Sequence, residues 1–446
     1  MRNVSVTYAI GAMCCIVSCN ASAAMDLSLD RAVEMIVAQS QDIKKADATL
    51  KQAEAQLDVA NSNRWFKVDG TVSYMNLVNV KRPFDGDYGI DLPPALGGVI
   101  ADALGNAGDF SRLEIPDNIF SAGISVTQPI YTFGKIGNAV RSVRNAIKMS
   151  EASKELTLRE VKYSAVDLYW TAKMTDDIVR LCESDLQDAK NARQSLTAAG
   201  RANRSNLVKI ESDIATKEIN LSDAKFNRDT AHRMLKILSG IDIDEELTLT
   251  DNFPSSFDDL NAGKLTDTPK WQILNSQVKM YEDKARSQRA GGYPTLAATA
   301  SYSYNAMDSE FNHMFNRDNS QSANWGIALQ VPIFTGGVNR ANATIDAMNA
   351  EAARQDLDKA KKLTTEEYDR AIAQYDHLRG NLKSLENARN LAAKAYKFSS
   401  ERFASGQTSA IELSEVSAGL YQLDMALLNA KYKILMSAES VKKLGE

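Results

Sequence analysis

Four segments of the sequence alternate between apolar and polar residues, with the two-residue period of a strand that has one apolar and one polar face. This alternation predicts strands at about 66–76, 120–132, 294–305 and 323–334. Aromatic residues gather near the strand ends, among them Trp65, Tyr131 and Phe334, as they do at the two interfaces of outer-membrane strands. Alternation alone is equally typical of a soluble sheet that packs one face against a core.

Long helices are the second expectation. The nine prolines leave two proline-free spans, 130–253 and 333–446, and proline is what most often ends a helix. Helical spacing from Ile136 to about Ala198 and from Val338 to about Ala404 predicts helices of roughly 90 to 100 Å each. The chain should reverse near Gly200 and Gly406, because glycine readily adopts the left-handed conformation that ends helices.

Heptad spacing follows the second of these glycines. The apolar seam there runs through Leu413, Val416, Leu420, Leu423, Leu427, Ala430, Ile434, Ser437, Val441 and Leu444. The aligned positions of the first half keep the seam except at Lys217 and Arg228. Taken alone, such heptads are also typical of an antiparallel coiled-coil hairpin.

The chain is an internal duplication. Phe66–Tyr74 matches Pro294–Tyr302, and Pro129–Thr132 matches Pro332–Thr335. Each half therefore reads helix, strand, strand, helix, glycine break, helix. This predicts a first repeat at 25–240, a linker at 241–267 and a second repeat at 268–446.

The N-terminus has the pattern of an export signal. Arg2 precedes an apolar run and then the small residues Ala21–Ala24, so residues 1–24 are expected to be a signal peptide. An alternative interpretation takes Ile16–Cys19 as a lipoprotein signal, with Cys19 as the lipidation site. After cleavage at Ala23 or Ala24 Cys182 is the one cysteine left, which excludes an intrachain disulfide.

Composition and charge narrow the function. The net charge is −5, with 52 Lys and Arg against 57 Asp and Glu, and no basic cluster could follow a nucleic-acid backbone. His232, His313 and His377 show no metal-ligand spacing, and Cys182 reads as a small core residue. We therefore expect no enzyme, no cofactor, no metal site and no nucleic-acid partner.

Four strands are too few to close a pore. The rest of the sequence has no apolar run long enough for a membrane helix, so a membrane span would have to be built from strands. Open sheet edges cannot be satisfied in hydrocarbon, so closure would need eight strands from two copies or twelve from three. Residues 76–119, rich in Gly, Pro and Asp, and the polar residues 306–322 suit external loops.

Three motifs complete the picture: Gln128–Gly134 (QPIYTFG), Val331–Gly337 (VPIFTGG) and Arg402–Leu413 (RFASGQTSAIEL). With the duplication and the heptads, they make the chain resemble the TolC-like outer-membrane efflux and secretion channels. The resemblance implies a mainly α fold with a transmembrane β-barrel portion. It implies a homotrimer with a 12-strand β-barrel that is continuous with a 12-helix α-barrel. The strand-to-helix motif would comprise Pro129, Gly134, Pro332, Gly336 and Gly337.

The same resemblance implies a function. The protein would be a passive exit duct in the outer membrane, with helices in the periplasm, for a tripartite efflux pump or a type I secretion system. A periplasmic adaptor (membrane fusion) protein and an inner-membrane RND or ABC transporter would open it by docking at the helical tips. The tip residues would be Gly200, Arg201, Gly406 and Gln407. The sequence does not identify the exported substrate or the pump.

The resemblance also points to a gate. Glu412 and Glu415 lie three residues apart on one helix face, where three copies would place six carboxylates around a narrow bore and attract cations. Two solvated glutamates beside a seam are the simpler alternative. Asn206, Phe403 and Thr408 replace residues that latch the closed state in some relatives, so the means of closure stays open.

A rival function class is a periplasmic coiled-coil adaptor or envelope tether without a membrane pore. It would explain the heptads but not four amphipathic strands with aromatic ends.

Overall fold

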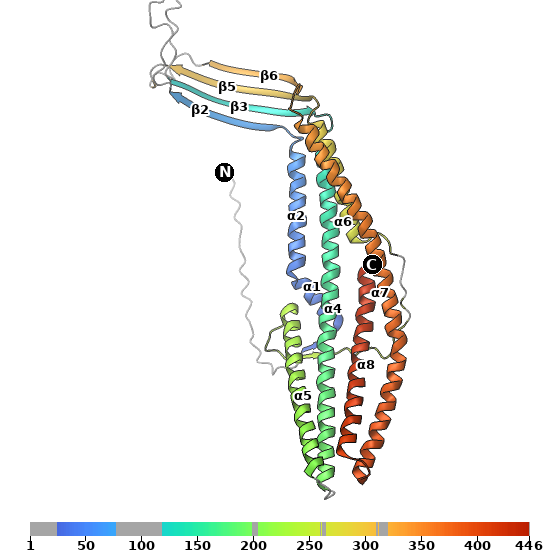
Figure 1. Ribbon diagram of the computed structural model, residues 1–446. Helices are drawn as coiled ribbons and strands as arrows, with labels where there is room; N and C mark the ends of the chain where they lie inside the picture. The colour runs from blue at the N-terminus through green and yellow to red at the C-terminus, as the bar shows by residue number, and fades with distance from the viewer. Residues whose placement is uncertain are drawn as a thin grey trace, which may run out of the picture. The chain divides into compact units, whose positions relative to one another are not determined.

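The computed structural model describes residues 25–76, 118–198, 204–258, 260, 265–308, 311 and 320–445. The signal peptide and Cys19 therefore lie outside the described residues, as do tip residues Gly200 and Arg201 and most of both expected loops. Within the described residues the chain is mainly helical (Figure 1). The helices are α1 (Leu29–Gln39), α2 (Gln41–Ser62), α4 (Lys135–Ala198), α5 (Arg204–Ser239), α6 (Pro269–Ala290), α7 (Val338–Ser405) and α8 (Ala410–Gly445).

The two halves repeat the same order of elements. Strands β2 (Lys67–Asn76) and β3 (Asn118–Tyr131) of the first half correspond to β5 (Thr295–Asp308) and β6 (Ser320–Gln330) of the second. Helices α2 and α6 both have 22 residues, and α5 and α8 both have 36. The long helices are α4 with 64 residues and α7 with 68, and they begin and end within one residue of the expected bounds. The expectation of two very long helices is therefore confirmed.

The chain divides into two compact units, and each unit takes segments from both halves. One unit comprises Met1–Leu50, Ser150–Ile273 and Asp356–Glu446. The other comprises Lys51–Met149 and Leu274–Gln355 and contains the large sheet. The fold of each unit thus depends on both repeats.

The large sheet has four strands in the order β2-β3-β5-β6 (Figure 1). All its neighbours are antiparallel, and the central pair β3–β5 joins the first repeat to the second. The register shifts between Pro129 and Tyr131, because proline has no N–H to give to the ladder. Strands β2 and β6 are the two edges.

A second, parallel sheet pairs β1 (Met25–Leu27) with β4 (Leu247–Leu249). The sequence predicts four amphipathic strands and a linker at 241–267. The structure adds two short strands, β1 before the first helix and β4 within that linker. Three-residue strands are too short to show a period, and they exist here because each supplies the other's hydrogen-bond partners. Met25 N–H donates to the Glu246 carbonyl at 2.8 Å, and Thr250 N–H donates to the Leu27 carbonyl at 3.1 Å.

The largest buried cluster lies where this small sheet meets α1, α4 and α5. Tyr169 is fully buried at its centre beside Leu27 and Leu235. The Tyr169 hydroxyl lies 2.8 Å from Asp251 Oδ2 and accepts the Asp251 N–H at 3.2 Å. Burial raises the pKa of Tyr169 to about 12, so the phenol stays protonated and available for these hydrogen bonds at neutral pH.

No helix in the part of the chain that the structure describes is both long enough and apolar enough to cross a membrane.

Replacing Leu235 should destabilise this cluster strongly. Leu235→Ala removes a fully buried side chain and should cost about 2–5 kcal/mol, from lost transfer free energy and the cavity left behind. Val208→Ala on the same helix is the control, because Val208 is exposed. Loss of the helical circular-dichroism signal on heating checks this. Equal melting temperatures for both variants would contradict it.

Candidate functional site

The register of the large sheet sorts its side chains into two chemically different faces. One face is mainly apolar, and many of its side chains are exposed, with Trp325 87% accessible. Directly paired residues form rows across all four strands on this face. Two such rows are Val68, Val126, Ala300, Trp325 and Gly70, Ile124, Tyr302, Ala323.

The opposite face carries small polar residues. Its rows include Asp69, Ser125, Ser301, Asn324 and Thr71, Gly123, Ser303, Ser322. Hydrogen bonds of 2.8 Å join Ser121 to Asn305 and Ser303 to Ser322 across neighbouring strands. An exposed apolar face backed by a hydrogen-bonded polar face is the arrangement of a wall between lipid and water.

The predicted strand-to-helix motif forms a tight turn in both repeats. Phe133 and Gly134 have φ of 48° and 87°, and Gly336 and Gly337 have φ of 61° and 78°. Glycine reaches this left-handed region without strain. Thr132 then caps α4 by accepting the Lys135 N–H on its carbonyl at 3.0 Å. The motif therefore redirects the chain from sheet to helix within a few residues, and Pro129 and Pro332 precede it.

Glu412 and Glu415 lie at the start of α8, and both side chains are exposed. Ser409 caps the helix, with its Oγ 3.2 Å from the Glu412 N–H, and Thr408 donates a hydrogen bond to the Glu412 carboxylate. A carboxylate in the first turn also meets the positive end of the helix dipole. The role of Glu412 and Glu415 as a gate stays a prediction.

The turn between α7 and α8 is built around Gly406, whose φ of 80° requires glycine. The N–H of Gln407 donates to the Arg402 carbonyl at 2.8 Å, which satisfies the helix end. Phe403 is buried in a cluster with Leu196, Ile210, Ile214 and Leu413. Phe403 therefore contributes apolar packing, and its side chain has no hydrogen-bonding group that could form a polar latch.

A polar network that sequence reasoning missed joins the α4–α5 hairpin to α8. Lys217 and Asp185 form a buried ion pair, 2.5 Å long, with side chains 8% and 14% exposed. Ser417 on α8 donates to the other Asp185 oxygen at 3.1 Å. Lys217, which interrupts the heptad seam, is thus one partner of a buried ion pair. A lysine in an apolar seam indicates a polar contact, but residue spacing does not identify Asp185 on α4 as its partner.

Two further contacts connect the same helices. Cys182 Sγ lies 3.3 Å from the Tyr421 hydroxyl, and the Tyr432 hydroxyl donates to Asp167. Burial, reinforced by the Asp167 carboxylate, raises the pKa of Tyr432 to about 12. Burial also raises the pKa of Asp188, near Asp185, above its ordinary value. Cys182 is buried, as expected for a small core residue.

In the part of the chain that the structure describes, no cluster of three or more His, Cys, Asp or Glu side chains could hold a metal ion. His232 instead lies 2.9 Å from Asp176.

Comparison with known proteins supports the resemblance that the sequence motifs indicate. Residues 272–444 match the family model described as outer membrane efflux protein. The match covers nearly all of the second repeat. The chain is also 22% identical over 345 residues to the alkaline protease secretion protein AprF of Pseudomonas aeruginosa, covering 74% of this chain and 69% of AprF.

Solved structures of outer-membrane proteins share the fold of this chain. The CmeC outer membrane channel of Campylobacter jejuni matches with a TM-score of 0.77 at 18% identity, over 100% of this chain and 93% of CmeC. The outer membrane protein VceC of Vibrio cholerae matches with a TM-score of 0.74 at 17% identity, over 94% of this chain and 96% of VceC.

The resemblance to the TolC-like outer-membrane channels is therefore confirmed. The mainly helical fold matches that of TolC-like channels. The family and its structural neighbours are channels rather than enzymes, and they agree with the expected outer-membrane location.

Replacing one partner of the buried ion pair should lower the stability of the protein strongly, whereas replacing both partners should not. Lys217→Met leaves Asp185 buried without its counter-ion and should lower the free energy of unfolding by about 3–5 kcal/mol. The double variant Lys217→Met/Asp185→Leu should recover most of this loss, because no charge is then left unpaired. Thermal unfolding of the purified protein measures both. A double variant no more stable than the single one would contradict the prediction.

Proposed function

We propose that this protein is the outer-membrane exit duct of a tripartite efflux pump or type I secretion system. The observation that carries the proposal is the sheet, one face of which is mainly apolar in its paired rows while the opposite face is mainly polar. Membership of its second half in the outer membrane efflux protein family supports the same function. The similarity to a secretion protein, AprF, and to an outer membrane channel, CmeC, agrees with either kind of export.

The edges of the sheet support an oligomer. Strands β2 and β6 each have a neighbour on one side within the described residues. An unpaired edge in hydrocarbon costs several kcal/mol for each polar group that lacks a partner. In our proposal β6 of one copy pairs with β2 of the next, and a homotrimer closes a 12-strand β-barrel that continues into a 12-helix α-barrel. The polar rows then line the lumen and the apolar rows face lipid.

The gate of this duct is proposed at the start of α8. Glu412 and Glu415 are exposed, so three copies would bring six carboxylates to the periplasmic end. Carboxylates at close quarters attract cations and repel anions. Opening would follow docking of a periplasmic adaptor and an RND or ABC transporter at the tips, which comprise Gly200, Arg201, Gly406 and Gln407.

The rival function, a periplasmic adaptor or tether, accounts less well for the sheet. A soluble protein rarely leaves a contiguous apolar face of this kind in water. On this face Trp325, Ile327 and Leu329 of β6 are exposed.

The oligomer provides the test of the proposed function. Detergent extracts of outer membranes should contain the protein as a heat-resistant trimer, because edge-to-edge strand pairing closes the barrel. Gel electrophoresis with and without boiling, together with light scattering, measures this. A monomer recovered in the soluble periplasmic fraction would refute the channel and favour the tether.

The gate has its own test. In planar bilayers, Glu412→Ala/Glu415→Ala should lose cation selectivity and the block by divalent cations, because the ring of carboxylates is gone. Glu439→Ala, on the same helix far from its start, is the matched control and should conduct like the wild type. Unchanged selectivity in the double variant would refute the gate while leaving the duct intact.

A further inference from the structure

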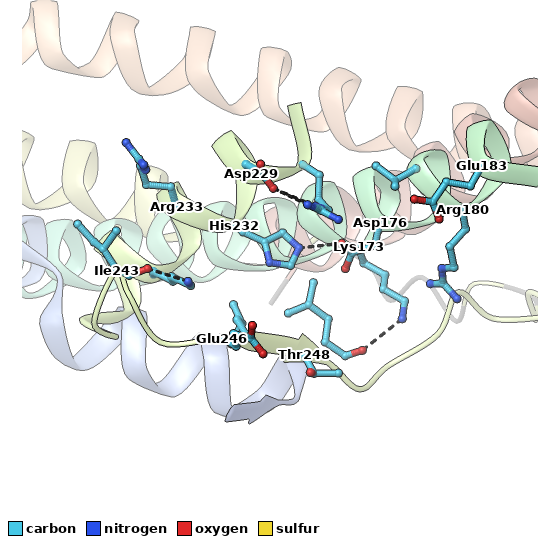
Figure 2. A pocket seen from close by; sticks show the side chains of 15 residues that line it. Lys173, Asp176, Arg180, Glu183, Asp229, His232, Arg233, Ile243, Glu246 and Thr248 are labelled. Atoms are coloured by element: carbon cyan, nitrogen blue, oxygen red, sulfur yellow. Dashed lines mark hydrogen bonds and ion pairs between the residues drawn. The ribbon is translucent and has the colours of Figure 1, made fainter. Parts of the chain in front are cut away.

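A cavity of about 760 Å³ lies between α4, α5 and the segment that contains β4 (Figure 2). Its lining comes from one compact unit and takes no part in the proposed gate or membrane wall. Basic residues outnumber acidic ones among the side chains that line it. The charged lining consists of Lys173, Arg180, Arg228, Arg233 and Lys236 against Asp176, Glu183, Asp229 and Glu246.

The pairing of these charges leaves two lysines without a direct ion-pair partner. Arg180 pairs with Asp177, which lies outside the lining. Asp229 pairs with Arg228 at 2.7 Å, Asp176 lies 2.9 Å from His232, and Glu183 pairs at 3.2 Å with Lys225, which is outside the lining. Lys173 and Lys236 instead donate to backbone carbonyls, of Leu249 at 3.3 Å and Ile243 at 2.9 Å. No carboxylate in the described residues pairs with either lysine, and each ammonium keeps two further donors.

The free edge of β4 opens onto this cavity. Glu246 and Thr250 bond to β1, and backbone groups alternate sides along a parallel strand. The N–H and C=O groups of Leu247 and Leu249 therefore face the other way, toward the cavity that both residues line. The Leu249 carbonyl confirms this direction, because it accepts the bond from buried Lys173.

We propose that the cavity binds an extended acidic peptide segment of a protein partner, which adds as a strand to the free edge of β4. Strand addition supplies main-chain hydrogen bonds to the N–H and C=O of Leu247 and to the N–H of Leu249, whose carbonyl keeps its bond from Lys173. The carboxylates of the segment meet the remaining donors of Lys173 and Lys236. A cavity of this volume suits several residues and greatly exceeds the size of a single phosphate ion. This site is separate from the tips and does not depend on the proposed channel function.

A defined peptide tests the proposal on the detergent-solubilised full-length protein. The probe is a fluorescent eight-residue peptide of alternating Asp and Thr, and fluorescence polarisation measures its binding. We expect saturable binding that weakens by roughly tenfold when Asn replaces Asp, because charge-assisted bonds are lost. Methylation of alternate backbone nitrogens should abolish binding, because those amides can no longer pair with β4.

The outcomes separate the alternatives. Equal binding of the methylated peptide, or full competition by inorganic phosphate at low concentration, would mean attraction of charge alone and would overturn strand addition. Absence of binding would overturn the site and leave Lys173 as a residue that only protects the strand edge.

A matched pair of variants locates the site. Lys236→Gln keeps a donor for the Ile243 carbonyl but loses the charge, so it should weaken the peptide roughly tenfold. Lys209→Gln, at an exposed position on the same helix, should bind like the wild type. Both variants should conduct normally in planar bilayers, which distinguishes failure of this site from failure of the proposed duct. Equal peptide binding by the two variants would overturn the assignment.

Discussion

The hydrogen-bonding demand of the backbone at the edges of the large sheet constrains everything else in this protein. Each edge strand, β2 and β6, carries a row of N–H and C=O groups that need partners. In water these groups are satisfied by solvent, but in hydrocarbon they require another strand. The apolar face of the sheet and its edges are therefore coupled. If the face enters lipid, the edge strands must pair with the edge strands of other copies.

The internal duplication lets each chain contribute four neighbouring strands to such an assembly. Strand β3 of the first repeat pairs with β5 of the second, so one chain supplies a four-strand sector from two similar halves. The turns that follow β3 and β6 use the same chemistry, with left-handed residues at Gly134 and at Gly336 and Gly337. Such turns direct two long helices away from the sheet.

The helical contacts combine apolar seams with a few polar bonds. A buried ion pair such as Lys217–Asp185 contributes little net stability, because desolvation opposes the attraction between the charges. Its geometry is more demanding than that of an apolar contact, so it can fix which turn of α5 faces which turn of α4. The bond from Ser417 to the same carboxylate extends that alignment to α8.

Local and periodic features follow from the amino-acid sequence, because each has a period or a residue type that acts over a few positions. They are the four amphipathic strands, the lengths of α4 and α7, the turn at Gly406 and the duplication. The sequence also carried enough motif to suggest the family. The β1–β4 pair, the partner of Lys217 and the cavity beside β4 become visible in the folded chain alone. These depend on segments distant in sequence, such as Met25–Leu27 and Leu247–Leu249, and no local pattern specifies which distant backbone or carboxylate will satisfy a buried polar group.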